Sequence, residues 1–236
     1  MRHRRLICVI ALMGLLGAAS AGPAMAADDP LEGLNRRVHS FNRTVQVNLL
    51  RPLAELYEAN TSPGFRRGVS NTVANLGEPV SAVSGLMAGD LDLAWNAAAR
   101  FGINSTLGLA GVYDPAASMG YARRPAAVAD ALCAWGVPSG PFLVLPLIGP
   151  STIRDAGALI ASTTALSQAI GPEAVLAWSA SDSLITYAEA QSELGRIEAQ
   201  SLDVYAVYRS AYLQRRAARC RTDRDPGDAE GDTGTP

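Results

Sequence analysis

The sequence predicts an all-α fold in a single domain, on three observations. Apolar residues recur every three or four positions along several stretches, beginning with Leu34, Val38, Phe41 and Val45, as on one face of a helix. No run of alternating apolar and polar residues predicts a strand, and no internal repeat is present. Residues 131–153 carry no formal charge and are broken by prolines and glycines, which predicts an apolar centre between the helices.

The first residues have the organisation of a secretory leader. Three arginines precede an apolar run, and Ala24-Met25-Ala26 has the small-x-small pattern at which signal peptidase cuts. Cys8 lies too early in this run to be a lipid-attachment cysteine. We therefore expect a signal peptide at 1–26, a helical domain at 27–216 and a disordered polar tail at 217–236, rich in Arg, Asp and Gly.

Apolar periodicity and turn residues divide the domain into helical segments. Gly77-Glu78-Pro79 is expected to interrupt one of them, and Gly171-Pro172 to break another. Asp90 is a good N-cap. The inner face of the helix after it is expected to hold Ala94, Ala97, Ala98 and Phe101. The expected segments are 34–49, 53–58, 65–76, the short apolar stretch 79–87, 91–101, 154–181 and the longest helix, 183–216.

The uncharged stretch is long enough to cross a bilayer as one helix, but its four prolines argue against that. The sequence predicts a bent hairpin instead, with one arm near Trp135, a turn at Pro138-Ser139-Gly140 and a second arm at 142–148. A new helix should follow, with Pro150 at its first position or Ser151 as its cap. Two interpretations fit this stretch alone: a hairpin in lipid whose backbone is satisfied by protein, or a buried loop of a soluble core.

Charge and cysteine content restrict the partners. The chain contains no lysine, and removal of the leader lowers its net charge from −2 to −5. An acidic chain is a poor partner for nucleic acid, and a P-loop needs a lysine. After cleavage only Cys133 and Cys220 remain. An oxidising compartment would permit a bond between them, but Cys220 falls in the predicted polar tail, which argues against one.

Little material for catalysis is available. His39 is the single histidine after cleavage, and no G-x-S-x-G nucleophile motif is present, so an ordinary surface or capping role is favoured over a catalytic one. No cluster of Cys, His or carboxylates has metal-site spacing, and no cofactor is expected. The glycines of 102–111 favour close helix packing over a phosphate loop. The composition indicates an exported helical protein with an apolar surface.

Several motifs, in order and without a large gap over about residues 29–216, resemble the VacJ/MlaA family. The most specific block runs from Trp135-Gly136-Val137 through Gly140–Pro146 to Gly149–Thr152 and Arg154-Asp155. The other matching residues are Asp29–Gly33, Asn35-Arg36, Phe41-Asn42, Arg51-Pro52, Gly68–Asn71, Asn75-Leu76, Glu78-Pro79, Arg100-Phe101, Ile103–Gly108, Asp114, Leu202-Asp203, Tyr205, Arg209, Tyr212 and Gln214.

The resemblance implies a membrane-embedded, ring-like set of amphipathic helices around the central hairpin, on the periplasmic side of the outer membrane. Such a protein removes misplaced phospholipid from the outer leaflet and passes it to a periplasmic lipid carrier, beside porin trimers. That role is non-enzymatic. The residues expected along the lipid path are Gly136, Gly140, Phe142, Leu143, Leu145 and Arg154. A guanidinium can bind phosphate through paired hydrogen bonds, although a salt bridge or helix-end contact is favoured for Arg154.

Two departures from the family pattern stand out. Many members carry a lipid-attachment cysteine at the cleavage site, where this chain has Ala24–Ala27, so we expect an exported protein without a lipid anchor. Residues 131–134 replace a segment that is usually polar and contains glycine. An envelope adaptor that binds porins, or a lipid hydrolase that uses His39 and serines, are the alternative functions.

Overall fold

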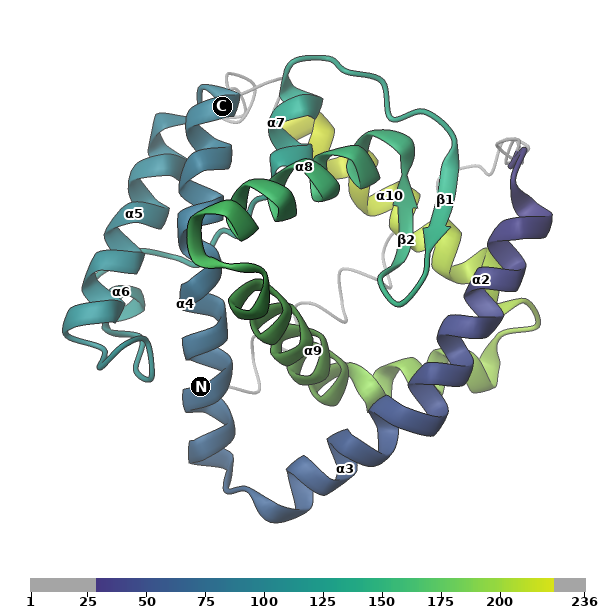
Figure 1. Ribbon diagram of the computed structural model, residues 1–236, viewed down its shortest axis with the longest axis horizontal. Helices are drawn as coiled ribbons and strands as arrows, with labels where there is room; N and C mark the ends of the chain where they lie inside the picture. Colours follow the sequence, from purple (N-terminus) through teal and green to yellow (C-terminus); the bar gives the residue numbers. More distant parts are fainter. Residues whose placement is uncertain (1–28, 223–236) are drawn as a thin grey trace, which may run out of the picture. The chain divides into compact units, whose positions relative to one another are not determined.

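Helices make up nearly all of the regular structure in the computed structural model, which describes residues 29–222 (Figure 1). The all-α prediction is confirmed, apart from one short hairpin. In chain order the elements are α2 (Glu32–Val45), a π-helical turn η1 (Gln46–Leu50), α3 (Arg51–Asn60), α4 (Pro63–Ala88), α5 (Leu91–Thr106), α6 (Pro115–Ser118), α7 (Val128–Ala134), β1 (Phe142–Leu145), β2 (Gly149–Thr152), α8 (Ile153–Ile170), α9 (Pro172–Gln200) and α10 (Val204–Thr222).

Helix α4 is continuous where the sequence predicted an interruption. The Ser62 hydroxyl accepts a hydrogen bond from the Phe65 amide at 3.2 Å, and Gly89 ends the helix with a φ of +79°. Pro79 lies inside the helix, where it removes one backbone hydrogen bond. The predicted break at 77–79 was wrong because α4 packs along α5, with Glu78 paired to Arg100 of that helix, and tertiary packing outweighs the local cost.

The C-terminal part of the chain differs from the prediction in three ways. Helix α9 is continuous through residues 181–183, where one predicted helix was expected to end and the next to begin. The expected helix 183–216 is divided at Ser201–Asp203, where α9 ends and α10 begins. The Asp203 carboxylate accepts from the Ala206 amide at 3.1 Å and so caps the first turn of α10. Helix α10 continues to Thr222, past the predicted start of the tail at 217. The predicted signal peptide and the remainder of the predicted tail lie outside the described residues.

The hairpin is antiparallel, with Phe142 opposite Thr152 and Leu145 opposite Gly149. Its turn therefore lies at 146–148, and the predicted turn at Pro138–Gly140 was wrong. Residues near Trp135, expected to form the first arm, belong to the end of α7 and the loop after it. Helix α8 begins at Ile153 with the Thr152 hydroxyl accepting from the Asp155 amide at 3.3 Å, so neither Pro150 nor Ser151 starts it.

Successive helices of the unit that begins at Leu31 pack in a closed series. Helix α4 contacts α5 and α7, α7 contacts α8, α8 contacts α9, and α9 returns to α3 and α4. The hairpin lies between α2 and α10 (Figure 1). The one apolar cluster found in the described residues is small and lies under the hairpin: Phe142, Val144, Tyr205 and Tyr212, with Val38 and Leu213 beside them.

Candidate functional site

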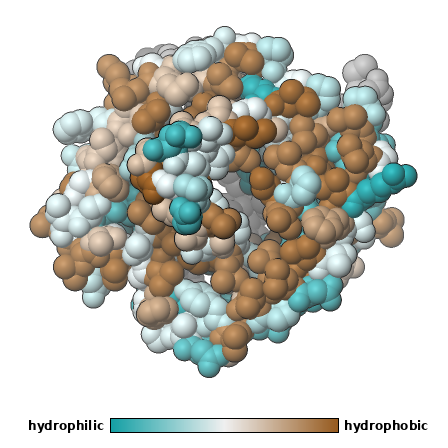
Figure 2. All heavy atoms as spheres, in the orientation of Figure 1, coloured by the Kyte–Doolittle hydropathy of each residue, from teal (hydrophilic) through white to brown (hydrophobic). Residues whose placement is uncertain are grey.

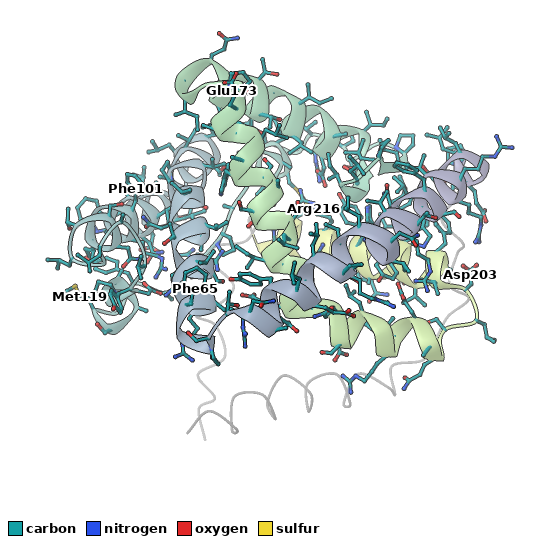
Figure 3. All side chains as sticks on the ribbon, turned by 60° about the horizontal axis from the view of Figure 1, so that its bottom comes forward. Phe65, Phe101, Met119, Glu173, Asp203 and Arg216 are labelled. Carbon is teal, nitrogen blue, oxygen red and sulfur yellow. A yellow bond between two sulfur atoms is a disulfide. The ribbon has the colours of Figure 1, made fainter. Side chains whose placement is uncertain are left out.

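Large apolar side chains lie on the outside of most of the helices and at the hairpin tip. Trp95, Leu147 and Leu176 are 67%, 67% and 71% exposed. Figure 2 shows apolar side chains gathered in broad patches, and Figure 3 shows Phe101 and Met119 at the outer edge of the α5–α6 region. Monomeric soluble proteins rarely expose apolar area of this extent. We name as the apolar surface Leu34, Phe41, Leu49, Leu56, Phe65, Leu76, Leu86, Leu91, Trp95, Leu107, Trp135, Leu147, Ile148, Ile160, Ile170 and Leu176.

Polar and charged side chains occupy buried positions that aliphatic residues fill in an ordinary core. Burial of such groups is costly unless each is hydrogen-bonded or paired. The buried polar set comprises Asn35, Asn42, Asn75, Glu78, Ser81, Ser84, Arg100, Asn104, Ser151, Thr152, Arg154 and Asp155. Many of them belong to the motifs that carry the family resemblance. Residues of those motifs therefore form polar contacts inside the protein.

Arg100 is at the centre of the first buried network. Its Nε lies 2.6 Å from Glu78 Oε1 and its Nη2 lies 3.2 Å from Asp114 Oδ2, while Nη1 donates to the Tyr121 carbonyl at 2.7 Å. The Arg100 and Glu78 side chains are each only 3% exposed. Burial raises the pKa of Asp114, but hydrogen bonds from Asn104 and Arg100 outweigh it and leave that pKa lowered. The network joins α4, α5 and the loop before α6.

The predicted inner face of α5 was half right. Ala94 and Ala97 are buried as expected, whereas Ala98 is exposed and Phe101 is 39% exposed. Arg100 continues the buried face in place of Phe101. The prediction assumed that apolar residues face inward, as they do in proteins surrounded by water. In this helix, large apolar residues are exposed instead.

Two asparagines of α2 hold the free edge of the hairpin. The Asn35 side chain donates to the Phe142 carbonyl at 3.2 Å and accepts from the Val144 amide at 2.8 Å. Two helical turns later, Asn42 donates to the Leu145 carbonyl at 2.9 Å and accepts from the Leu147 amide at 2.7 Å. Each amide side chain therefore substitutes for a residue of a neighbouring strand, which satisfies the outer edge of β1.

The hairpin residues predicted along the lipid path separate into two faces. Phe142 is buried against Tyr205 and Tyr212, with ring centroids 6.2 and 6.0 Å away. Leu143 and Leu145 point to the opposite side of the strand and are half-buried. The turn that follows exposes Leu147, whose φ is +66°. The hairpin thus presents one anchored face and one accessible apolar face.

The two predicted glycines lie in the loop that leads into the hairpin. Gly136 has a φ of +78° and Gly140 a φ of +68°, a region that side chains other than glycine rarely adopt. A Cβ at Gly140 would lie 3.2 Å from Ile153 Cβ, whereas one at Gly136 would meet nothing within 4 Å. The absence of a side chain at Gly140 therefore allows the loop to pack closely against Ile153 at the start of α8.

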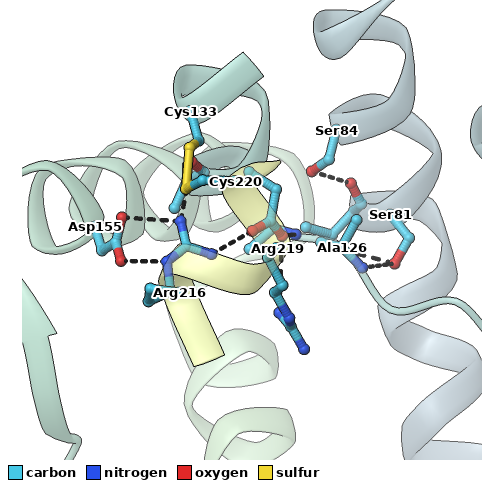
Figure 4. A network of polar contacts seen from close by, with 12 residues as sticks. Ser81, Ser84, Ala126, Cys133, Asp155, Arg216, Arg219 and Cys220 are labelled. Atoms are coloured by element: carbon cyan, nitrogen blue, oxygen red, sulfur yellow. Dashed lines mark hydrogen bonds and ion pairs between the residues drawn. A yellow bond between two sulfur atoms is a disulfide. The ribbon is translucent and has the colours of Figure 1, made fainter. Parts of the chain in front are cut away.

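Arg154 lies in a buried network at the base of the hairpin, which agrees with the salt-bridge interpretation. Its Nε donates to Asp155 Oδ1 at 2.9 Å and its Nη1 to the Val137 carbonyl at 3.0 Å. Arg216 of α10 pairs with Asp155 at 2.8 Å and with Asp130 of α7 (Figure 4). Burial raises the pKa of Asp155, but the Tyr212 hydroxyl and the two guanidinium charges outweigh it and leave that pKa lowered.

A disulfide joins Cys133 of α7 to Cys220 of α10 beside this network (Figure 4). The sequence argument against a bond was wrong, because Cys220 belongs to a helix rather than to a tail. The bond and the Arg216 ion pairs together hold the end of α10 against α7. Helix α10 also supplies Tyr205 and Tyr212 to the hairpin cluster. The disulfide and the Arg216 ion pairs therefore also hold in place the helix on which the hairpin packs.

His39 lies among aromatic rings, 5.7 Å from Tyr205 and 5.5 Å from Tyr208 between ring centroids. Burial, together with the nearby Arg43 charge, lowers its pKa. Among residues 29–222, no group of three His, Cys, Asp or Glu side chains is arranged to hold a metal ion. In the same part of the chain, no helix combines the length and the apolar composition needed to cross a membrane.

The exposed apolar side chains, the buried polar networks and the anchored hairpin define a class of helical protein with an apolar outer surface. The particular family follows from comparison. The model of the MlaA lipoprotein family matches residues 27–219, and the chain belongs to that family. Sequence reasoning found these motifs, but it did not find that Asn35, Asn42 and Arg100 are buried. The available signal was spacing: Asn42 follows Asn35 by seven positions and Arg100 follows Ala97 by three, so each pair lies on one face of its helix.

Named relatives are similar over much of this chain. The intermembrane phospholipid transport system lipoprotein MlaA of Escherichia coli is 33% identical over 208 residues, which are 85% of this chain and 82% of that protein. An uncharacterised protein of Rickettsia felis is 34% identical over 139 residues. These are 59% of this chain, which spans only about half (55%) of that protein. A solved structure described as the "structural basis for maintenance of bacterial outer membrane lipid asymmetry" has a TM-score of 0.72 and 32% identity, covering 82% of this chain and 99% of that one.

Proposed function

We propose that this protein is the outer-membrane component of a retrograde phospholipid transport system. It would take mislocalised phospholipid from the outer leaflet and pass it to a periplasmic carrier protein, which maintains lipid asymmetry. The E. coli relative is named for phospholipid transport, and the similar solved structure is described in terms of lipid asymmetry. The apolar surface is the single observation that carries the proposal.

The exposed apolar side chains explain why a surface of this kind belongs in lipid. In water, exposed apolar area costs about 25 cal/mol for each Å², a cost that disappears against acyl chains. We propose that the helices lie as a ring in the periplasmic leaflet, beside a porin trimer. Figure 2 shows the surface hollowed near its centre, among α8, α9 and the hairpin, and the polar headgroup would pass there.

The hairpin is the proposed moving part of the lipid path. Leu143 and Leu145 provide an accessible apolar face, and Phe142 anchors the opposite face to α10. Gly136 and Gly140 allow the loop to change direction. Arg154 enters the path as a positioning residue, because its ion pair with Asp155 and its bond to the Val137 carbonyl hold the loop at the base of the hairpin.

Attachment without a lipid anchor is a further part of the proposal. The family is described as lipoprotein, whereas the cleavage site of this chain reads Ala24–Ala27 and offers no cysteine there. The apolar surface would then hold the protein in the membrane. Intact-mass analysis of the exported protein should give a chain that starts at or near Ala27 without an acyl group; a mass with a lipidated Cys8 would contradict this.

The decisive experiment measures surface-exposed phospholipid in a deletion strain complemented with wild type or Gly140→Pro. Proline cannot adopt a φ of +68°, so the loop must take another course. We expect Gly140→Pro, at normal abundance, to raise outer-leaflet phospholipid and detergent sensitivity. Gly120→Pro is the matched control, because Gly120 also has a positive φ (+94°) but lies in the turn after α6.

Three outcomes would point elsewhere. If lipid asymmetry stays intact with Gly140→Pro at wild-type abundance, the hairpin is a structural scaffold and the lipid path lies elsewhere in the protein. Normal asymmetry in the deletion strain, with altered porin behaviour, would indicate an adaptor protein. A lipase signal that a serine probe abolishes would indicate a hydrolase.

A further inference from the structure

A cavity of about 300 Å³ opens where the end of α3, the start of α4 and the middle of α9 meet, on elements that do not include the hairpin. That volume is at the lower end of small-ligand sites. Charged side chains of both signs line it: Arg66 and Arg67 from α4, Glu58 from α3 and Glu189 from α9. Nothing in the lipid path described above uses these residues.

The two arginines differ in how they are held. Arg66 Nη1 donates to the carbonyl oxygens of Glu58 at 2.9 Å and Thr61 at 2.6 Å, so its guanidinium is fixed at the α3–α4 turn. Arg67 is exposed, and within residues 29–222 neither guanidinium forms an ion pair with a carboxylate. A planar guanidinium that is not already paired is well suited to bind phosphate oxygens.

Tyr57 supplies an independent observation at the same cavity. Its hydroxyl is buried and has no hydrogen-bond partner among the described residues. Burial raises the pKa of this hydroxyl, and the charge of Arg66 opposes that rise, so the group is a neutral donor at pH 7. A buried donor without an acceptor is costly, and a ligand oxygen in the cavity would remove that cost.

The carboxylates distinguish between classes of headgroup. The Ser70 hydroxyl donates to Glu189 Oε1 at 2.8 Å and orients it, and Glu58 also lines the cavity. Two guanidiniums and two carboxylates balance in charge. A headgroup with only a negative charge would be repelled by the carboxylates, whereas a headgroup that joins a phosphate to an ammonium group would match both signs.

We infer that this cavity binds a zwitterionic headgroup of the phosphoethanolamine type, with its phosphate on Arg66, Arg67 and Tyr57 and its ammonium group on Glu189. Phe65, labelled in Figure 3, and Leu56 are adjacent in sequence to residues of the cavity. They are 57% and 62% exposed and would lie beside the acyl chains. The inference rests on the proposed function and names the lipid class that this second site selects.

The test measures binding of labelled phosphatidylethanolamine to the full-length exported protein in detergent micelles. Arg67→Gln should raise the apparent Kd about tenfold, since a charge-assisted bond to phosphate is lost. Tyr57→Phe should also weaken binding and should not lower the melting temperature, because it removes a hydroxyl that has no internal partner. Arg37→Gln, an exposed arginine of α2, removes the same charge elsewhere and should bind as wild type.

Soluble competitors identify the source of the phosphate. Displacement of the labelled lipid by glycerophosphoethanolamine, with little effect of glycerophosphoglycerol or inorganic phosphate, supports the inference. Equal displacement by inorganic phosphate would make this a free-phosphate site and overturn it. Binding by Arg67→Gln and Tyr57→Phe that equals Arg37→Gln would overturn it as well.

Complementation of a deletion strain separates this inference from the proposed function. If wild type restores lipid asymmetry while Arg67→Gln binds lipid normally, only the headgroup site is wrong. If wild type does not restore asymmetry, the proposed function is wrong, whatever the micelle assay gives.

Discussion

Loss of the Cys133–Cys220 bond should destabilise the whole domain. The bond closes a loop between residues separated by 87 positions. In the chain-entropy model, closing a loop of that length removes about 4.5 kcal/mol of unfolded-state freedom, although many native disulfides contribute about 2–4 kcal/mol. For a domain of this size, each kcal/mol shifts the melting temperature by about 2–4 °C. We therefore expect Cys220→Ala to melt about 10 °C below wild type.

The loss should also have a local consequence, because α10 carries Tyr205 and Tyr212 into the hairpin cluster. Without the bond, ion pairs of Arg216 and Arg219, the hydrogen bond from Tyr212 to Asp155 and the aromatic packing remain to hold its C-terminal half. Limited trypsin digestion should then cut α10 earlier than other helices. The measurement is thermal unfolding by circular dichroism in detergent, together with a digestion time course.

A reductant provides the control. Dithiothreitol should lower the melting temperature of wild type to that of Cys220→Ala and leave the variant unchanged. Cys220→Ala keeps the buried Cys133 in place and removes only the partly buried sulfur of Cys220, so the change in packing is small. A variant that melts within about 2 °C of wild type and is digested at the same rate would show that ion pairs and packing alone hold α10, and would refute the loop-entropy argument.

Three further perturbations test other parts of the molecule. Arg100→Gln leaves the buried Glu78 carboxylate without its ion pair and should cost about 3–5 kcal/mol in chemical denaturation, whereas Arg124→Gln, which breaks an exposed pair, should cost less than about 1 kcal/mol. Burial lowers the pKa of His39, so the unfolded chain binds the proton more readily than the folded chain does. The free energy of unfolding should therefore fall as the pH drops below about 6.5. His39→Gln should reduce this fall when thermal unfolding is compared at pH 7.5 and 5.5, and an unchanged pH dependence would exclude His39 as its source. Leu143→Asp with Leu145→Asp places two charges on the accessible hairpin face, at roughly 2.5–3.5 kcal/mol each if central in the membrane, so the variant should misfold or leave the membrane fraction; release of wild type by salt wash alone would contradict an embedded surface.

Local signals in the sequence determined the positions of most helices. Asp90 caps α5 as expected, and Gly171-Pro172 separates α8 from α9. Such signals are local: a side chain bonds an amide three residues away, or a backbone angle excludes all but glycine. They could not predict that α4 runs through Pro79, since the packing that maintains it comes from α5.

Apolar periodicity also found the right helices, but only part of the interior. A repeat of every three or four residues indicates that a helix has two unlike faces, but it does not say which face is turned inward. We expected Phe101 inside because apolar residues of proteins in water normally face inward. It is 39% exposed, and Arg100 takes the buried position on α5, where it pairs with Glu78 of α4.

The candidate site needed the tertiary structure for the same physical reason. Asn35 meets the Phe142 carbonyl from 107 positions away, and Cys133 meets Cys220 from 87. Hydrogen bonds, ion pairs and disulfides act over a few ångströms. The sequence therefore determined that these groups exist and on which elements they lie, whereas only the folding of α2, the hairpin and α10 onto one another decided which of them are partners.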